Sequence, residues 1–244
     1  MYLDRAIYTL LGQFDKADAA FEELKVRLAE AGKPPFGLFP SDPGLFLARR
    51  GRWEEALDLL TEGLAYTKAH KHHLSSVRTA SVRGGLLLEM GDLAGAEEDL
   101  QWAYETACNN HSVMNVLKTA PALCELYVAQ GRTAAAAVLL NEHRSLAQEL
   151  APYGGASGDL WLASARYHAA TGDFEKAEAR FEAAATLYAR FSLPWDQAQV
   201  AAKWALSIPE ASQGRTELFR KATHLRDTIG ASKYPQQPAT RLKS

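Results

Sequence analysis

Small and apolar residues recur along this chain at spacings of three and four, which is the repeat of an α-helix with one buried face. Residues 177–188 show the pattern well, because Ala177, Phe181, Ala184 and Tyr188 all fall on one stripe. The pattern predicts an all-α protein built from amphipathic helices.

A glycine followed five positions later by an alanine occurs five times at nearly constant spacing. The five pairs are Gly12 and Ala17, Gly51 and Ala56, Gly91 and Ala96, Gly131 and Ala136, and Gly172 and Ala177. The glycines are separated by 39, 40, 40 and 41 residues, and a large apolar residue follows each alanine by four. A fixed period of this length indicates a supersecondary unit stacked in tandem, which is the organisation of a solenoid.

Each repeat has the pattern of a helical hairpin. The glycine suits the left-handed residue that ends a helix, and the alanine suits the close approach of two antiparallel helices. First helices of the pairs are predicted at residues 42–50, 74–90, 113–130, 158–171 and 195–206. The first of these is short because four prolines and three glycines occupy residues 32–44. The last belongs to a degenerate sixth repeat, whose second helix is predicted at residues 215–229.

The repeat between residues 158 and 190 carries the fullest motif. Its tryptophan, small residues, turn glycine and aromatic residues are Trp161, Ala165, Gly172, Phe174, Ala177, Phe181 and Ala184. In these positions the chain resembles the tetratricopeptide repeat family, over roughly residues 1–205. The resemblance implies a right-handed superhelical solenoid of antiparallel helix pairs, although the period here is about 40 residues where the family standard is about 34.

The longer period is similar to that of the C-terminal superhelices of bacterial signalling ATPases, such as large transcriptional activators and some adenylate cyclases. That likeness implies that the chain is the regulatory part of a larger protein. We expect residues 1–230 to form one solenoid of five clear repeats and a degenerate sixth. Residues 231–244 are expected to be a C-terminal tail or linker.

Composition and charge narrow the classes of partner. The formal net charge of −2 gives no case for nucleic acid or an anionic membrane as an obligatory partner. No apolar stretch approaches the roughly 20 residues that a bilayer crossing needs, and no secretory signal precedes the repeats. Cys108 and Cys124 lack a metal-type spacing and are expected to be free thiols rather than a disulfide, which favours a cytoplasmic location. The basic stretch from Arg215 lacks the interleaved aromatics of a nucleic-acid arm.

Catalytic motifs are missing from the sequence. There is no phosphate-binding glycine loop with lysine, no nucleophile elbow, no His-Glu-x-x-His and no Cys-x-x-Cys, so neither an enzyme nor a cofactor is expected. His70, His72 and His73 form one ligand-like cluster, for which a position at a helix end is the favoured interpretation over a metal site.

The family resemblance implies a concave groove lined by the first helices, in which an extended peptide or protein segment binds. Its predicted partner-binding residues are Arg78, Ser81, Lys118, Glu125, Leu162 and Arg166. Arg78, Lys118 and Arg166 would form a basic ladder for carboxylates of a protein or peptide partner, or of other domains of the parent chain. The alternative is that they are solvated helix charges. A second hypothesis is a small-ligand sensor with a cavity lined by Trp102, Trp161, Trp195 and Trp204.

Overall fold

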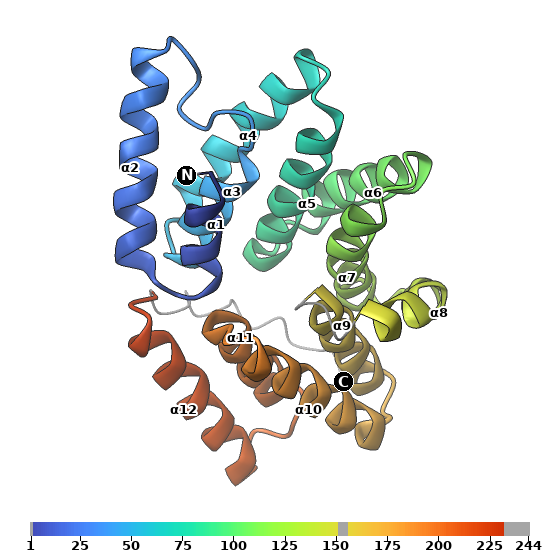
Figure 1. Cartoon of the computed structure of the whole chain (residues 1–244). Helices are drawn as coiled ribbons and strands as arrows, with labels where there is room; N and C mark the ends of the chain where they lie inside the picture. The colour runs from blue at the N-terminus through green and yellow to red at the C-terminus, as the bar shows by residue number, and fades with distance from the viewer. Residues whose placement is uncertain (1, 151–155, 232–244) are drawn as a thin grey trace.

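The computed structural model describes residues 2–150 and 156–231, which contain α-helices and turns but no strand. Within this part of the chain, twelve helices follow one another in six antiparallel pairs (Figure 1). The first six are α1 (Tyr2–Leu10), α2 (Phe14–Glu30), α3 (Ser41–Arg49), α4 (Trp53–Ala69), α5 (His73–Met90) and α6 (Leu93–Asn109). The last six are α7 (Val113–Ala129), α8 (Thr133–Leu150), α9 (Ala156–Ala170), α10 (Phe174–Arg190), α11 (Pro194–Leu206) and α12 (Gln213–Thr228). The predicted all-α solenoid is confirmed.

Each of the five predicted turn glycines ends the first helix of a pair in the left-handed conformation, with φ between +68° and +87°. At Gly91, for example, the amide donates a hydrogen bond of 3.1 Å to the carbonyl of Leu88, which satisfies an orphan acceptor of α5. The turns between pairs use the same conformation with other residues, since Lys71, His111 and Ser192 have φ between +50° and +56°. The sequence did not reveal this second set of turns, because lysine, histidine and serine adopt the left-handed conformation far less readily than glycine does.

Small residues set the distance between the two helices of a pair. The alanine five positions after each turn glycine is buried in every repeat. Seven positions before the glycine, Gly84 on α5 faces Leu100 on α6, and a Cβ atom at Gly84 would lie 2.7 Å from Leu100 Cγ. A larger side chain at either position would therefore push the helices apart.

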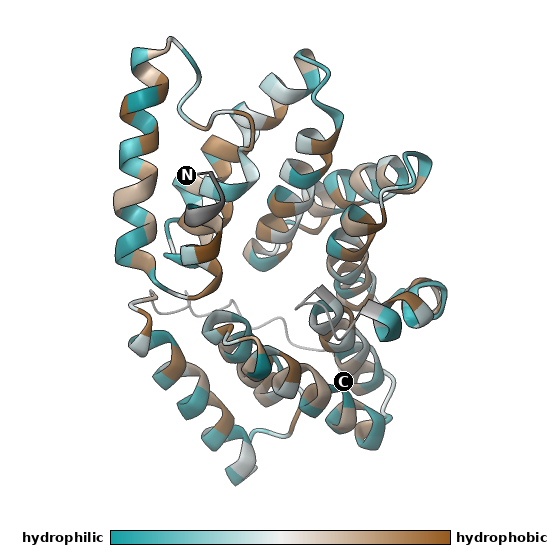
Figure 2. Ribbon diagram, viewed as in Figure 1, coloured by the Kyte–Doolittle hydropathy of each residue, from teal (hydrophilic) through white to brown (hydrophobic). Residues whose placement is uncertain are grey.

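Hydrophilic and hydrophobic residues alternate along the ribbons of α2 and α12, as amphipathic helices require (Figure 2). The core runs along the array as linked clusters rather than as one central ball. In the last of these, the rings of Phe181 and Trp204 stack with centroids 5.4 Å apart, which joins α10 to α11. Neighbouring pairs therefore hold one another by contacts of short sequence separation.

The array closes on itself, so that the last helix pair packs against the first two (Figure 1). The seam between them comprises Gly12, Arg49 and Arg50 on one side and Trp195, Asp196, Ile229 and Gly230 on the other. A guanidinium nitrogen of Arg50 donates a hydrogen bond of 2.7 Å to the carbonyl of Gly230. The Ile229 side chain lies so close to Gly12 that a Cβ atom there would be 2.6 Å from Ile229 Cγ2. An open groove was expected, and the structure has a ring instead.

Ala231 is the last described residue and packs into the cluster that joins the two ends of the ring, where it is 7% exposed. The contacts between the two ends of the ring therefore extend to Ala231. The rest of the predicted tail or linker, residues 232–244, lies outside the described part of the chain.

Candidate functional site

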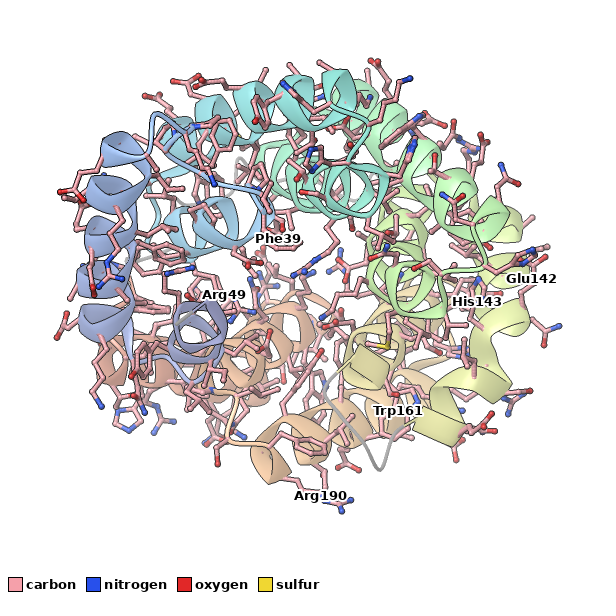
Figure 3. The ribbon with its side chains drawn as sticks, turned by 45° about the horizontal axis from the view of Figure 1, so that its top comes forward. Phe39, Arg49, Glu142, His143, Trp161 and Arg190 are labelled. Atoms are coloured by element: carbon pink, nitrogen blue, oxygen red, sulfur yellow. The ribbon has the colours of Figure 1, made fainter. Side chains whose placement is uncertain are left out.

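A cavity of about 420 Å³ lies at the centre of the ring, and we call it the lumen. The six odd-numbered helices all contribute side chains to its wall, while the even-numbered helices lie mostly outside (Figure 3). Its polar lining residues include Thr9, Ser41, Asp42, Arg49, Arg78, Ser81, Glu89, Asn115, Lys118, Thr119, Asp159, Tyr188, Asp196 and Gln199. Its apolar lining residues include Leu10, Leu45, Val82, Leu86, Leu193, Trp53 and Trp195.

Arg49, at the end of α3, connects three helices at the seam. Its guanidinium forms an ion pair of 2.9 Å with Asp196 of α11, and the two side chains are only 8% and 15% exposed. The same group donates a hydrogen bond of 3.3 Å to the carbonyl of Thr9 in α1 and lies 5.7 Å from the ring centroid of Trp195. Because its charge is largely removed from water, losing Asp196 or Arg49 would leave an uncompensated ion in the wall.

Asp42 and Arg78 form a second pair across the wall, between α3 and α5. Their atoms Oδ1 and Nη2 are 3.0 Å apart. Burial raises the pKa of Asp42 above its ordinary value, while the charge of Arg78 and a hydrogen bond from Ser41 oppose the rise. The lumen therefore holds this carboxylate in a poorly solvated setting.

Asp159, near the start of α9, is a second lumen carboxylate with a raised pKa. The hydroxyl of Tyr188 donates a hydrogen bond to its Oδ1 atom. Burial raises the pKa of Asp159; Lys118 opposes this rise and Asp196 adds to it. Burial and the adjacent Asp159 likewise raise the pKa of the Tyr188 phenol well above its usual range, so that the phenol remains a hydrogen-bond donor.

Lys203 of α11 fastens the last repeat to the middle of the ring. Its ammonium lies 2.5 Å from a carboxylate oxygen of Glu125 on α7 and 3.5 Å from one of Glu89 on α5. All three side chains are at least three-quarters buried. This network joins three helices whose residues are far apart in the sequence.

The six predicted groove residues divide among three settings. Arg78, Ser81 and Lys118 line the lumen. Glu125 is engaged by Lys203, and Leu162 is 6% exposed and packs in the core with Phe181. Arg166 is half-buried on α9 and does not line the lumen. The expected basic ladder is thus interrupted, because Arg78 is paired with Asp42 and Arg166 lies apart from the cavity wall.

The aromatic lining expected for a ligand cavity is largely wrong. Of the four tryptophans proposed, Trp195 lines the lumen, and Trp53, which was not proposed, joins it. Trp102 and Trp161 pack against buried residues between helices instead, and Trp204 stacks on Phe181 and borders a smaller pocket of about 220 Å³ beside α12. Large aromatic rings on amphipathic helices fill interhelical space before they reach a cavity, which explains the error.

Arg49, Asp42 and Asp196 are lumen residues that the sequence prediction did not include, whereas the repeat register predicted that Asp159 faces the groove without counting it among the six partner-binding residues. Asp159 has the same offset from its turn glycine as Arg78 and Lys118, so the repeat register contained a signal for it. Arg49 and Asp196 face each other only because the ring closes, and no local pattern marks that contact.

The remaining candidate groups lie outside the lumen. The His70 ring stacks on Tyr66 at 4.0 Å between centroids at the C-terminal end of α4, as predicted, whereas His72 and His73 lie at the N-terminal end of α5. Among the described residues, no group of three or more His, Cys, Asp or Glu side chains is placed to hold a metal ion. Cys108 and Cys124 are free thiols, and burial raises the pKa of Cys124 to about 12. None of the described helices is both long enough and apolar enough to cross a membrane.

Three segments of the chain match a family model, that of the tetratricopeptide repeat. They are residues 44–61, 122–142 and 160–183. Each is centred on a turn glycine and spans a helix pair of the ring, namely α3–α4, α7–α8 and α9–α10. These three segments are similar to tetratricopeptide repeats, and the paired helices form a solenoid of that kind. No curated protein matches the chain.

Tetratricopeptide repeats generally mediate protein–protein interactions and are generally not catalytic. In this ring, the helices that would line an open concave groove enclose the lumen instead. The lumen and its rims are therefore the surface on which a binding function has to be sought.

Proposed function

We propose that this chain is a non-enzymatic interaction module that holds a segment of a protein partner against the inner face of its ring. The observation that carries the proposal is that helices from all six repeats direct polar side chains into one lumen. A segment entering it would meet Arg78, Ser81 and Lys118 from two neighbouring repeats. The similarity of three repeats to the tetratricopeptide family supports the same function.

The partner is a cytoplasmic protein or another domain of the parent chain. The parent in this proposal is a bacterial signalling protein, in which the ring is the regulatory part. The lumen combines paired charges with apolar walls, as a site for an extended peptide with mixed side chains requires. Binding there would be transmitted through the seam, since Arg49 contacts both the lumen and the last repeat.

Affinity capture from a bacterial lysate tests the proposal. The bait is the chain itself, beside a triple variant with Arg78→Glu, Lys118→Glu and Arg166→Glu. A matched control carries three charge reversals on exposed residues outside the lumen, namely Lys33→Glu, Arg144→Glu and Arg190→Glu. Circular dichroism and melting temperature establish that all three baits are folded.

A protein captured by the parent and the outer-face control but lost from the lumen variant would support the proposal. Because Arg166 lies apart from the lumen, a second variant with Arg78→Glu and Lys118→Glu should lose the same protein. Equal capture by all folded baits would overturn binding through the inner face.

A small-ligand sensor is the second candidate function. The observation that favours it is the volume of the lumen, about 420 Å³, which falls in the range of roughly 300–1,000 Å³ typical of small-molecule sites. A ligand-dependent rise in melting temperature with no captured protein would favour the sensor over the scaffold.

A further inference from the structure

Lys118 is a cation of the lumen wall whose charge is not consumed by a neighbour. It is exposed on α7, and its charge lowers the pKa of both Asp42 and Asp159, so it lies near both carboxylates. Among the described residues it nevertheless forms no ion pair, whereas the other two lining cations, Arg49 and Arg78, are paired at 2.9 and 3.0 Å. Lys118 is therefore the cation of the wall that is free to receive an anionic group.

Asp159 is its counterpart of opposite sign. Its Oδ1 atom accepts the Tyr188 hydrogen bond, and no described side chain engages Oδ2. The carboxylate lines the lumen and is poorly solvated, as the upward shift of its pKa indicates. A cationic group from a ligand would supply the direct ion pair that Asp159 does not form with Lys118, whose charge acts on it without one.

The charge balance of the lumen favours a ligand that carries both signs. Asp196 and Asp42 are paired with arginines, and Glu89 contacts Lys203, which it shares with Glu125. Among the described lining residues, the cation Lys118 and the anion Asp159 are then the two charges that form no ion pair. A ligand of single charge would satisfy one of them and leave the other desolvated, which costs binding free energy.

Size and apolar surface limit the ligand further. The lumen has a volume of about 420 Å³, and Leu45, Val82, Leu86 and Trp195 give it apolar walls beside the charges. A molecule with an ammonium, a carboxylate and an apolar side chain matches this combination. A free amino acid and a peptide of two or three residues share that chemistry.

We propose that the lumen is a site for a small zwitterion of the amino-acid or short-peptide class, with its ammonium on Asp159 and its carboxylate on Lys118. This inference rests on the proposed function in so far as the ring is a binding module. It goes beyond the proposed function because it names the class of molecule in the lumen. It also assigns the ligand's ammonium to Asp159 and its carboxylate to Lys118.

Direct titration tests the proposal. Intrinsic fluorescence reports on the lumen because Trp53 and Trp195 line it, and calorimetry gives the affinity. The probes are the free L-amino acids, and alanine- and leucine-containing di- and tripeptides. Each probe is paired with its N-acetylated form and its carboxy-amidated form, which remove one charge apiece.

At least one amino acid or peptide is expected to bind with millimolar or tighter affinity and to raise the melting temperature. Blocking either end should weaken it by about 10- to 100-fold, the range for one charge-assisted hydrogen bond. Comparison of the affinities of the free amino acids with those of the peptides shows which of the two classes the lumen binds. If no zwitterion binds at millimolar concentration, or if the blocked forms bind as well as the free ones, the proposal is wrong.

Two variants assign the charges to residues. Lys118→Met should weaken the free ligand about 10-fold or more and abolish the preference for a free carboxylate, while the preference for a free ammonium persists. Asp159→Asn keeps an acceptor for Tyr188 and should have the converse effect. Lys33→Met and Asp58→Asn, both exposed outside the lumen, serve as matched controls and should bind as the parent does. Unchanged discrimination in both folded lumen variants would overturn the assignment.

The outcome separates this inference from the proposed function. Zwitterion binding without lumen-dependent protein capture would support the site and reject the protein scaffold. Lumen-dependent capture without zwitterion binding would reject the site and leave the scaffold in place.

Discussion

The middle of the array and the seam hold neighbouring helices together by different means. In the middle, buried alanines and leucines such as Ala96, Leu100 and Ala136 let helices approach closely. The carboxylate buried at the crossing of α5 and α6, Asp99, is paired within the same repeat with Arg83. At the seam, two arginines reach across to Asp196 and to the carbonyl of Gly230. Residue repetition thus builds the array, but polar contacts between dissimilar ends close it.

The two kinds of contact differ because the helix crossings are repeated along the array, whereas the seam occurs once. An internal helix crossing recurs in every repeat, so one small residue at a fixed offset satisfies all of them. The seam occurs once and joins helices with unrelated sequences, where long side chains can span an irregular gap. We therefore expect the array and the seam to respond to mutation independently, and the following changes test that expectation.

The largest effect is expected from Ala177→Arg, in the middle of a repeat. The alanine is 3% exposed, and arginine there would overpack the crossing by about 1–3 kcal/mol and add the cost of a buried charge. The variant should lose most of its cooperative melting transition in circular dichroism. Ala136→Arg should behave in the same way, and Ala170→Arg, at an exposed alanine of α9, should not. An unchanged melting temperature in both buried variants would show that the helix register is wrong.

Arg49→Ala should have the next largest effect, confined to the seam. Removing the guanidinium leaves Asp196 without its partner in a mostly buried wall, which costs about 3 kcal/mol or more. Small-angle X-ray scattering should show a larger maximum dimension as the ring opens, while helix content stays constant. Arg52→Ala removes a solvent-exposed pair with Glu55 and should change neither quantity, because water and salt screen such a pair. A closed ring in the Arg49 variant would contradict the role assigned to the seam.

A smaller loss of stability is expected from alanine at Gly12, and comparison with Gly172 separates the loss of packing at the seam from backbone strain. Gly12 and Gly172 both have left-handed φ values, +68° and +80°, so alanine at either position costs about 1 kcal/mol in strain. At Gly172 the new Cβ would meet nothing within 4 Å, whereas at Gly12 it would collide with Ile229 and Pro194. Gly12→Ala should therefore lower the free energy of unfolding by about 1–3 kcal/mol more than Gly172→Ala. Equal losses in denaturant titrations would mean that the seam contact is dispensable.

The smallest effect is expected from Asp159→Asn and depends on pH. The pKa of this carboxyl is raised in the folded state, so the native protein holds its proton more tightly than the unfolded chain does. The contribution of Asp159 to the free energy of unfolding is fully present below pH 3.8, the ordinary pKa of this carboxyl. It is lost as the pH rises through the higher pKa that the carboxyl has in the folded state. The variant should melt higher than the parent at neutral pH, and the difference should vanish under acidic conditions. Asp58→Asn, at an exposed position of α4, is the control whose melting curve should follow the parent at both pH values.

Several residues that line the lumen could be predicted from their position within a single helix. Arg78 and Lys118 were found because both lie thirteen positions before a turn glycine, on the inner side of a first helix. Leu162 was misplaced because its offset is shared with Ser81, yet the helix carrying it turns that position into the core. Small rotations of a helix about its axis decide between wall and core, and sequence spacing does not record them.

The sequence by itself determined the helical hairpins, their turns and their stacking, because all of these depend on contacts within one repeat. Helical periodicity and the left-handed glycine are local properties of the chain. The tertiary structure alone decided that six repeats close into a ring. Arg49 and Asp196 are 147 residues apart, and they meet because small rotations between successive repeats add up around the array. The lumen and its unpaired Lys118 and Asp159 exist as a site only through that closure.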